Sequence, residues 1–153
     1  MSKKKVLVIG GTGIAGQFIT DYLLHYHDIC ELFIASRGIH KISEKKVKFI
    51  KMDIHDTQNI ESVIKQFDII ILALYPQAAV DFIEKYGSYI KSGAIVTDSS
   101  GIKRAICPSL SALSKKYGFV FIGSHPMAGK ETNGFDVSEA DLYKNASYII
   151  TPC

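Results

Sequence analysis

A glycine-rich turn near the N-terminus constrains the fold of this chain more than any other feature. The segment VLVIGGTGIAGQF holds the pattern G-x-G-x-x-G between an apolar β-rich run and an amphipathic segment. In such a unit Gly11 permits the tight turn, Gly13 lets the backbone approach a pyrophosphate, and Gly16 lets the helix pack against the strand. The free N–H groups at the helix start face the phosphates. We expect these glycines, with Thr12 and Ile14, to bind a dinucleotide; a merely tight turn is the alternative.

Short β-rich runs alternate with amphipathic segments along the whole chain. The expected strands are Lys5–Ile9, Leu32–Ala35, Lys48–Met52, Ile69–Leu74, Ala94–Thr97, Val120–Ile122 and Ser147–Thr151. The expected helices are Ile14–Tyr26, Gln58–Phe67, Gln77–Tyr89 and Arg104–Tyr117, and the last should begin or bend at Pro108. Several strands are continuous apolar runs, as in a parallel sheet covered on both faces. The pattern predicts an α/β fold of the Rossmann type, a doubly wound, mostly parallel sheet with helices on both faces.

Length and composition are those of one globular domain. The 153 residues are 47% hydrophobic and 22% charged, with a net charge of +3, so residues 1–153 suit a single dinucleotide-binding domain. The basic clusters Ser2–Lys5 and Glu44–Lys48 flank apolar strands and are better explained as solvated strand ends than as a nucleic-acid site. We see no signal-peptide pattern and no apolar run of the roughly 18–20 residues that a membrane span needs. We expect a cytoplasmic protein that binds neither nucleic acid nor membrane.

The cysteines and histidines do not predict a metal site. Cys30, Cys107 and Cys153 are far apart in the sequence and show no CxxC spacing, so neither a disulfide framework nor a zinc site follows, and reduced thiols are expected. His25 and His27 lie two residues apart on one expected helix and face different directions. We expect no bound metal.

The end of the second expected strand bears on the choice of cofactor. A site that prefers NAD usually has a carboxylate there, which accepts a hydrogen bond from the ribose 2′-hydroxyl. This chain reads FIASRG, with Ser36 and Arg37 at that place and no acidic residue. A hydroxyl beside a guanidinium suits a 2′-phosphate, so NADP is favoured and NAD is the second choice. A solvated arginine at a strand end is the alternative.

The segment GSHPMAGKETNG follows an apolar run and places His125 ahead of a proline. Ligands of an open α/β sheet bind outside the carboxyl ends of the strands, so His125 and the earlier TDSSGIK loop should lie on the cofactor side. A neutral imidazole there can accept a proton from a substrate hydroxyl. Pro126 restricts His125 to extended backbone, which fixes its direction. A loop histidine bonded to backbone is the competing interpretation.

GSHPMAGKETNG resembles the G-x-H-P-M-A-G-x-E-x-x-G signature of the prephenate dehydrogenase family. VTDSSGIK is similar to that family's D-x-x-S-x-K segment, ILALYP to its fourth-strand turn with Leu74 and Tyr75, and YIITP to the end of its nucleotide-binding domain. The resemblance implies oxidation of prephenate, or of its amino counterpart arogenate, with loss of the ring carboxylate. It also implies that His125 is the catalytic acceptor of the ring-hydroxyl proton, and that Leu74 and Tyr75 line the cofactor.

The chain departs from the family pattern at two places. Gly101 stands where the pattern has its active-site serine, and Ser100 is a candidate to supply the hydroxyl from one position away. An N-cap of the next helix is the alternative role for Ser100. Family members also continue into a helical domain that dimerises and binds the substrate carboxylates, whereas this chain stops at Cys153. We therefore expect an isolated nucleotide-binding domain, inactive alone, with homodimerisation of the full-length protein through the missing part.

Other functions remain open at this point. The segments GGTGIAG and SR also suggest a short-chain dehydrogenase, but no tyrosine here is followed four residues later by lysine, as that family's catalytic pair requires. Deazaflavin-dependent NADP reductases share the N-terminal pattern without accounting for SHPMAG. A non-catalytic NADP-sensing module is the alternative that involves no enzyme.

Overall fold

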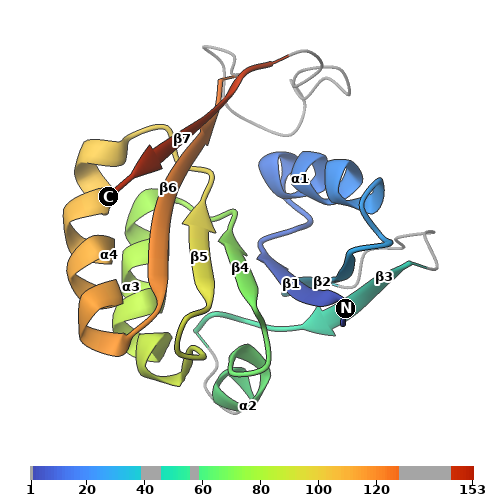
Figure 1. The fold of residues 1–153 in the computed structure, drawn as a ribbon, viewed down its shortest axis with the longest axis horizontal. Coiled ribbons are helices and arrows are strands. Elements are labelled where there is room, and N and C mark those ends of the chain that lie inside the picture. Colours follow the sequence, from blue (N-terminus) through green and yellow to red (C-terminus); the bar gives the residue numbers. More distant parts are fainter. Residues whose placement is uncertain (1, 39–45, 56–58, 128–145) are drawn as a thin grey trace.

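The computed structural model describes residues 2–38, 46–55, 59–127 and 146–153. Seven strands form one sheet in the order β3-β2-β1-β4-β5-β6-β7. The strands are β1 (Lys4–Ile9), β2 (Cys30–Ser36), β3 (Val47–Lys51), β4 (Ile69–Leu72), β5 (Ile95–Asp98), β6 (Val120–Pro126) and β7 (Tyr148–Pro152). The helices are α1 (Ile14–Leu24), α2 (Ile60–Ile64), α3 (Pro76–Tyr86), followed by a 3₁₀ turn (Gly87–Tyr89), and α4 (Lys103–Tyr117). All neighbouring strands are parallel except β6 and β7, so the expected Rossmann-type sheet is confirmed (Figure 1).

The two faces of the sheet are packed against different helices, because side chains alternate along each strand. On one face Leu7 and Ile9 of β1 join the larger core with residues of α2, α3 and α4. On the other face Val6 and Val8 pack with Ile19 of α1. Helices therefore cover both faces, as the continuous apolar strands predicted.

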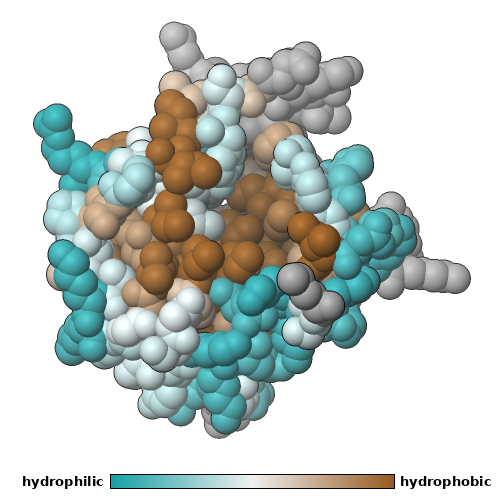
Figure 2. All heavy atoms as spheres, viewed as in Figure 1, coloured by the Kyte–Doolittle hydropathy of each residue, from teal (hydrophilic) through white to brown (hydrophobic). Residues whose placement is uncertain are grey.

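On the face of the sheet that packs against α1, the half formed by β5, β6 and β7 is not covered by any helix among the described residues. Ile95 of β5 pairs with Val120 of β6, and both point away from Val96 and Phe121, which belong to the core under α3 and α4. The exposed fractions of Ile95 and Val120 are 37% and 49%, and Ile150 of β7 is 63% exposed. In the view of Figure 2 a band of hydrophobic residues runs over the middle of the molecule, framed by hydrophilic ones.

Helix α4 differs from expectation at its start. It begins at Lys103, five residues before Pro108, and continues through the proline. Ile106 and Leu110, on either side of Pro108, are fully buried in the core. This packing offsets the backbone hydrogen bond that the proline cannot donate.

No helix in the described part of the chain is both long enough and apolar enough to cross a bilayer.

Candidate functional site

The glycine turn after β1 contains contacts that are too close for residues with a Cβ atom. Gly10, which we had not singled out, carries the positive φ of 79°, and its N–H donates to the carbonyl of Ala35 at 2.9 Å. A Cβ on Gly16 would lie 2.2 Å from the carbonyl oxygen of Gly10, so Gly16 brings α1 against the turn as expected. A Cβ on Gly11 would lie 2.4 Å from Ile34. Gly11 is therefore required for space, and the left-handed backbone of the turn belongs to Gly10.

The N-terminus of α1 is open at this turn. Gly13 is the N-cap and no side chain caps the helix; Gly13 and Ile14 are exposed, and Thr12 is half-buried. Helix starts of this kind offer unpaired N–H groups and a positive dipole end to an anion. The turn therefore fits the pyrophosphate of a dinucleotide, both in the space left by the glycines and in its hydrogen-bond donors.

The turn after β4 lies beside the glycine turn. A Cβ on Gly10 would come within 3.3 Å of Cδ2 of Leu74. Tyr75, which follows, is the N-cap of α3, has no side-chain capping bond and is 87% exposed. The chain leaves β1 toward β2 on one side, while β4 lies on the other, so this is the topological switch point where open α/β sheets bind ligands. The structure thus brings Leu74 and Tyr75 to the predicted cofactor edge.

Ser36 and Arg37 lie at the carboxyl end of β2, next to β1 on the same edge. The Ser36 hydroxyl donates to the carbonyl of Gly38 at 2.8 Å, which leaves its lone pairs free. Arg37 is exposed and forms no ion pair with the described carboxylates. A free guanidinium at this place is the arrangement that a ribose 2′-phosphate would need.

His125 lies inside a strand and not in the loop that we expected. Strand β6 extends past Ile122 to Pro126, and His125 pairs with Ile149 of the antiparallel strand β7. The expected strand end was wrong because β6 continues beyond Ile122, its last residue paired with β5. The residues after Ile122 stay in the strand because they pair with β7. The remainder of the histidine signature, from residue 128, is outside the described residues.

The imidazole of His125 lies against the backbone of Gly101. A Cβ on Gly101 would be 3.1 Å from Nε2 and 3.3 Å from Cε1 of His125. Gly101 is exposed and its φ is not left-handed, so the glycine leaves space beside Nε2 and is not needed for an unusual backbone conformation. No hydrogen bond to this imidazole occurs within the described ranges, so the competing idea of a backbone-bonded histidine gains no support.

Ser100 sits one residue before that contact, in a buried position. Its N–H donates to Oδ2 of Asp98 at 2.8 Å, while its buried hydroxyl has no hydrogen-bond partner in the described structure. The N-cap of α4 is Ile102, without a side-chain bond, so the alternative role of Ser100 as an N-cap is wrong. Among the described residues the Ser100 hydroxyl is unpaired, and Gly101, the next residue, lies beside the His125 imidazole.

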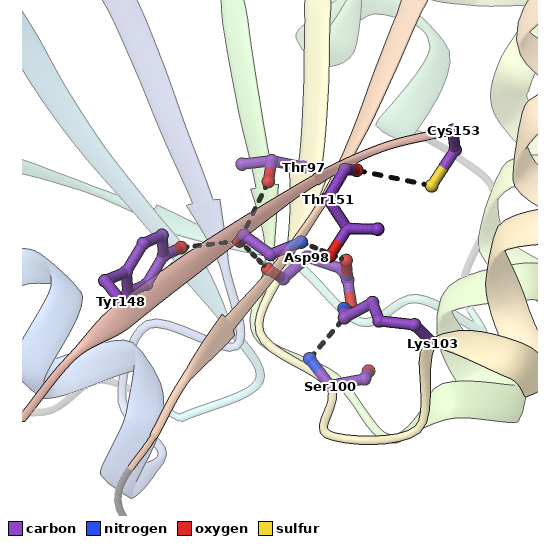
Figure 3. A network of polar contacts seen from close by, with 8 residues as sticks. Thr97, Asp98, Ser100, Lys103, Tyr148, Thr151 and Cys153 are labelled. Atoms are coloured by element: carbon purple, nitrogen blue, oxygen red, sulfur yellow. Dashed lines mark hydrogen bonds and ion pairs between the residues drawn. The ribbon is translucent and has the colours of Figure 1, made fainter.

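A buried carboxylate joins strand β6 to the loop that follows β5 (Figure 3). Asp98, fully buried at the end of β5, accepts the N–H of Ser124 on Oδ1 at 3.1 Å and the N–H of Ser100 on Oδ2. Lys103 completes the group through an ion pair with Oδ2. A buried carboxylate is stable only when paired and hydrogen-bonded. Asp98 therefore fixes the strand residue preceding His125 relative to the loop that contacts the imidazole.

The hydroxyl of Ser124 joins strands β5, β6 and β7. It donates to the carbonyl of Asp98, accepts from Thr97 at 3.0 Å, and meets the Tyr148 hydroxyl at 2.6 Å. Since the single Ser124 hydrogen points at the carbonyl, Tyr148 is the donor in the third bond. Burial raises the pKa of Tyr148, which keeps the phenol neutral.

Sequence reasoning assigned no role to this network. The charges Asp98 and Lys103 bound the loop after a buried strand, and that spacing in TDSSGIK was a usable signal. Nothing in the sequence pointed to Tyr148, because its contact exists only through the β6–β7 pairing. Among the described residues no group of three or more histidine, cysteine, aspartate or glutamate side chains could hold a metal ion.

Comparison with models of protein families identifies the family of this chain. Residues 34–153 match the family model described as prephenate dehydrogenase, nucleotide-binding domain. The chain belongs to the prephenate dehydrogenase family.

Relatives of known name agree with this family. A prephenate dehydrogenase of Lactococcus lactis is 29% identical over 152 residues, which are 97% of this chain and 41% of that protein. A prephenate dehydrogenase of Bacillus subtilis is 26% identical over 97% of this chain and 40% of its own length. The chain thus spans about two fifths of these prephenate dehydrogenases.

Solved structures share the fold. The arogenate dehydrogenase of Synechocystis is 28% identical with a TM-score of 0.72, and the match covers 97% of this chain and 50% of that one. A prephenate dehydrogenase from A. aeolicus, in complex with hydroxyphenyl propionate and NAD+, has a TM-score of 0.66 over 100% of this chain and 52% of its own, at 24% identity. The likeness to prephenate and arogenate dehydrogenases extends over the whole sheet.

Proposed function

We propose that this chain is the cofactor-binding part of an NADP-preferring dehydrogenase that oxidatively decarboxylates prephenate or arogenate. The products are 4-hydroxyphenylpyruvate or tyrosine, respectively. The observation that carries the proposal is the imidazole of His125, which has no hydrogen bond among the described residues. It lies beside Gly101, on the sheet edge that also holds the glycine turn and the open start of α1. A proton acceptor and a dinucleotide site on one edge are what the oxidation of an alcohol by hydride loss requires.

The similar proteins support this reaction class. Three of them are named prephenate dehydrogenase, and one of these is a complex with NAD+; the fourth is named arogenate dehydrogenase. These names support a small cyclic substrate and a nicotinamide cofactor for this chain. Prephenate and arogenate are both retained in the proposal.

In this mechanism Nε2 of His125 accepts the proton of the ring hydroxyl. Its removal drives electrons toward the carbinol carbon, which loses its hydrogen as hydride. Bound NADP supplies the hydride acceptor. The bond between the ring and its carboxylate then breaks, carbon dioxide leaves, and the electron pair completes the aromatic ring, whose oxygen takes the proton back from His125. The unpaired hydroxyl of Ser100 is the second candidate catalytic group, as a donor or acceptor toward the reacting oxygen. The contribution of these residues is mainly positioning.

The proposed role of His125 is tested in the full-length gene product. His125→Asn should lower kcat by about 10²–10⁴-fold and leave the Kd for NADP nearly unchanged. The backbone pairing of His125 with Ile149 does not depend on the side chain, so the variant should remain folded. His25→Asn is the matched control, because His25 is exposed at the end of α1, far along the chain from the site.

The same assay separates the enzyme from the sensing module. A variant with wild-type kcat would remove His125 from the mechanism. A full-length protein that binds NADP and oxidises neither prephenate nor arogenate would favour the sensing module. Sedimentation of the full-length protein tests the further proposal, made on the family resemblance, that it is a homodimer.

The cofactor preference rests on Arg37. Arg37→Ala should weaken NADP binding by about 10- to 100-fold, because hydrogen bonds to charged groups contribute about 1.5–3 kcal/mol. Binding of NAD should change little. Titration of wild type and variant with both cofactors measures this, and equal losses for the two cofactors would contradict the 2′-phosphate role.

A further inference from the structure

Two cysteines that are far apart in the sequence meet behind the strand that carries His125. A Cβ built on Gly123 of β6 would lie 3.1 Å from Sγ of Cys107 and 3.2 Å from Sγ of Cys153. Both sulfur atoms therefore occupy the space that a side chain at Gly123 would fill. They lie on the same side of the strand and within reach of each other.

The register of the sheet explains this meeting. Gly123 pairs with Thr151 in the antiparallel β6–β7 ladder, and Cys153 lies two residues farther along the chain, so its side chain leaves the same face. That face is covered by α4, where Cys107 follows Lys103 by one helical turn. The Lys103 side chain also reaches Gly123, with Cδ 3.2 Å from the same point. The cysteine pair thus adjoins the Asp98–Lys103 ion pair without belonging to it.

The two thiols differ in reactivity. All three described cysteines are free; Cys153 is exposed, Cys107 is partly buried, and Cys30 is buried in the separate core under α1. Burial raises the pKa of the Cys107 thiol to about 12, and its hydrogen bond with Cys153 adds to the shift. Because Cys153 is exposed and Cys107 is partly buried, Cys153 is the thiol that an oxidant meets first. Once Cys153 has reacted, its contribution to the raised pKa of Cys107 is lost.

We propose that Cys107 and Cys153 form a reversible disulfide by exchange with a small-molecule disulfide of the glutathione type. The Cys153 thiolate attacks one sulfur of glutathione disulfide, the sulfur–sulfur bond breaks, and one glutathione thiolate leaves. Cys107 then loses its proton to water and attacks the sulfur of Cys153, displacing the second glutathione. Two protein thiols are oxidised and one glutathione disulfide is reduced to two thiols.

Such a bond would tie the end of β7 to α4. The β6–β7 ladder extends to His125, and α4 supplies Lys103, so the cross-link would restrain the elements on either side of the site. Oxidation should raise the thermal midpoint of the chain by roughly 5–10 °C relative to the reduced form, because the cross-link closes a long loop in the unfolded state.

The experiment treats the folded chain with glutathione disulfide and measures its intact mass and its proteolytic peptides. Wild type should lose two hydrogen atoms, give one cross-linked peptide with Cys107 and Cys153, and revert with dithiothreitol. Cys107→Ser should stop at a stable glutathione adduct on Cys153. Cys153→Ser should give neither cross-link nor adduct at Cys107. Cys30→Ser is the matched control and should behave as wild type.

Two outcomes would overturn the proposal. One is a folded wild-type chain that keeps a glutathione adduct on Cys153 and never closes to the disulfide. The other is a cross-link that includes Cys30. Both are measured on wild type, so they remain decisive even if a serine variant fails to fold.

Discussion

Substitution of Gly16 offers the sharpest test of how the glycine turn works. A methyl group at Gly16 would lie 2.2 Å from the Gly10 oxygen and 2.6 Å from the Cα of Gly11, both backbone atoms. Ordinary contact begins near 3.4 Å, so α1 would have to move from the turn by roughly 1 Å. Overpacking of this kind costs about 1–3 kcal/mol, which lowers the midpoint of a chain of this size by about 3–10 °C.

Gly13→Ala is the matched comparison in the same turn. The only close contact of a Cβ at Gly13 is the Gly10 oxygen at 3.3 Å, and its φ of −74° suits alanine. The fold should therefore lose about 1 kcal/mol or less. The methyl group would nevertheless stand at the start of α1, where the phosphates are expected, so NADP binding should weaken more than stability does.

Thermal unfolding with and without NADP, together with titration of the cofactor, distinguishes the two variants. Gly16→Ala should lower the midpoint of the free protein, whereas Gly13→Ala should mainly abolish the rise in midpoint that NADP produces. The reasoning is refuted if Gly16→Ala unfolds at the wild-type temperature, or if Gly13→Ala is the less stable of the two.

The remaining predictions concern three other positions. Asp98→Asn should lower the free energy of unfolding by about 3 kcal/mol in urea, because it leaves Lys103 buried without a charge partner, and Asp98→Asn with Lys103→Met should recover part of the loss. The hydrogen bond from Lys91 holds the pKa of Asp68 below its ordinary 3.8. The stability that this bond adds is therefore present above pH 3.8 and disappears as the pH falls through the lowered pKa. In acid denaturation curves, the advantage of wild type over Asp68→Asn should vanish in that acidic range. Gly101→Ala would place a methyl group 3.1 Å from Nε2 of His125 and should lower kcat in the full-length protein while the Kd for NADP stays constant.

The local parts of the fold were predictable from the sequence. The order of strands and helices and the mostly parallel sheet follow from apolar runs and helical periodicity, which each segment carries by itself. The glycine turn was recognised for the same reason, although Gly10, which carries the positive φ, was not singled out. The need for glycine at position 10 depends on how the turn meets Ala73, the residue after β4, a contact between segments distant in the sequence.

The candidate site was predictable only in its reactive residues. His125 was identified from its motif, but its place inside β6 depends on β7, which the chain reaches more than twenty residues later. The Asp98 network likewise includes Ser124 of β6, which no local pattern connects with Asp98. The start of α4 before Pro108 shows tertiary packing overriding a local preference.

The central position of β1 has a consequence for how the chain is made. Strand β1 leaves the ribosome well before β4, which is one of its two neighbours in the sheet and pairs with it through Val6 and Ile69. At synthesis rates of about 5–20 residues per second, β1 waits roughly 3–13 s before that partner exists. During that interval Leu7 and Val8, both completely buried in the finished sheet, have no partner on the β4 side. We therefore expect the nascent chain to bind hold-type chaperones until β4 emerges, and to release them when the two halves of the sheet join.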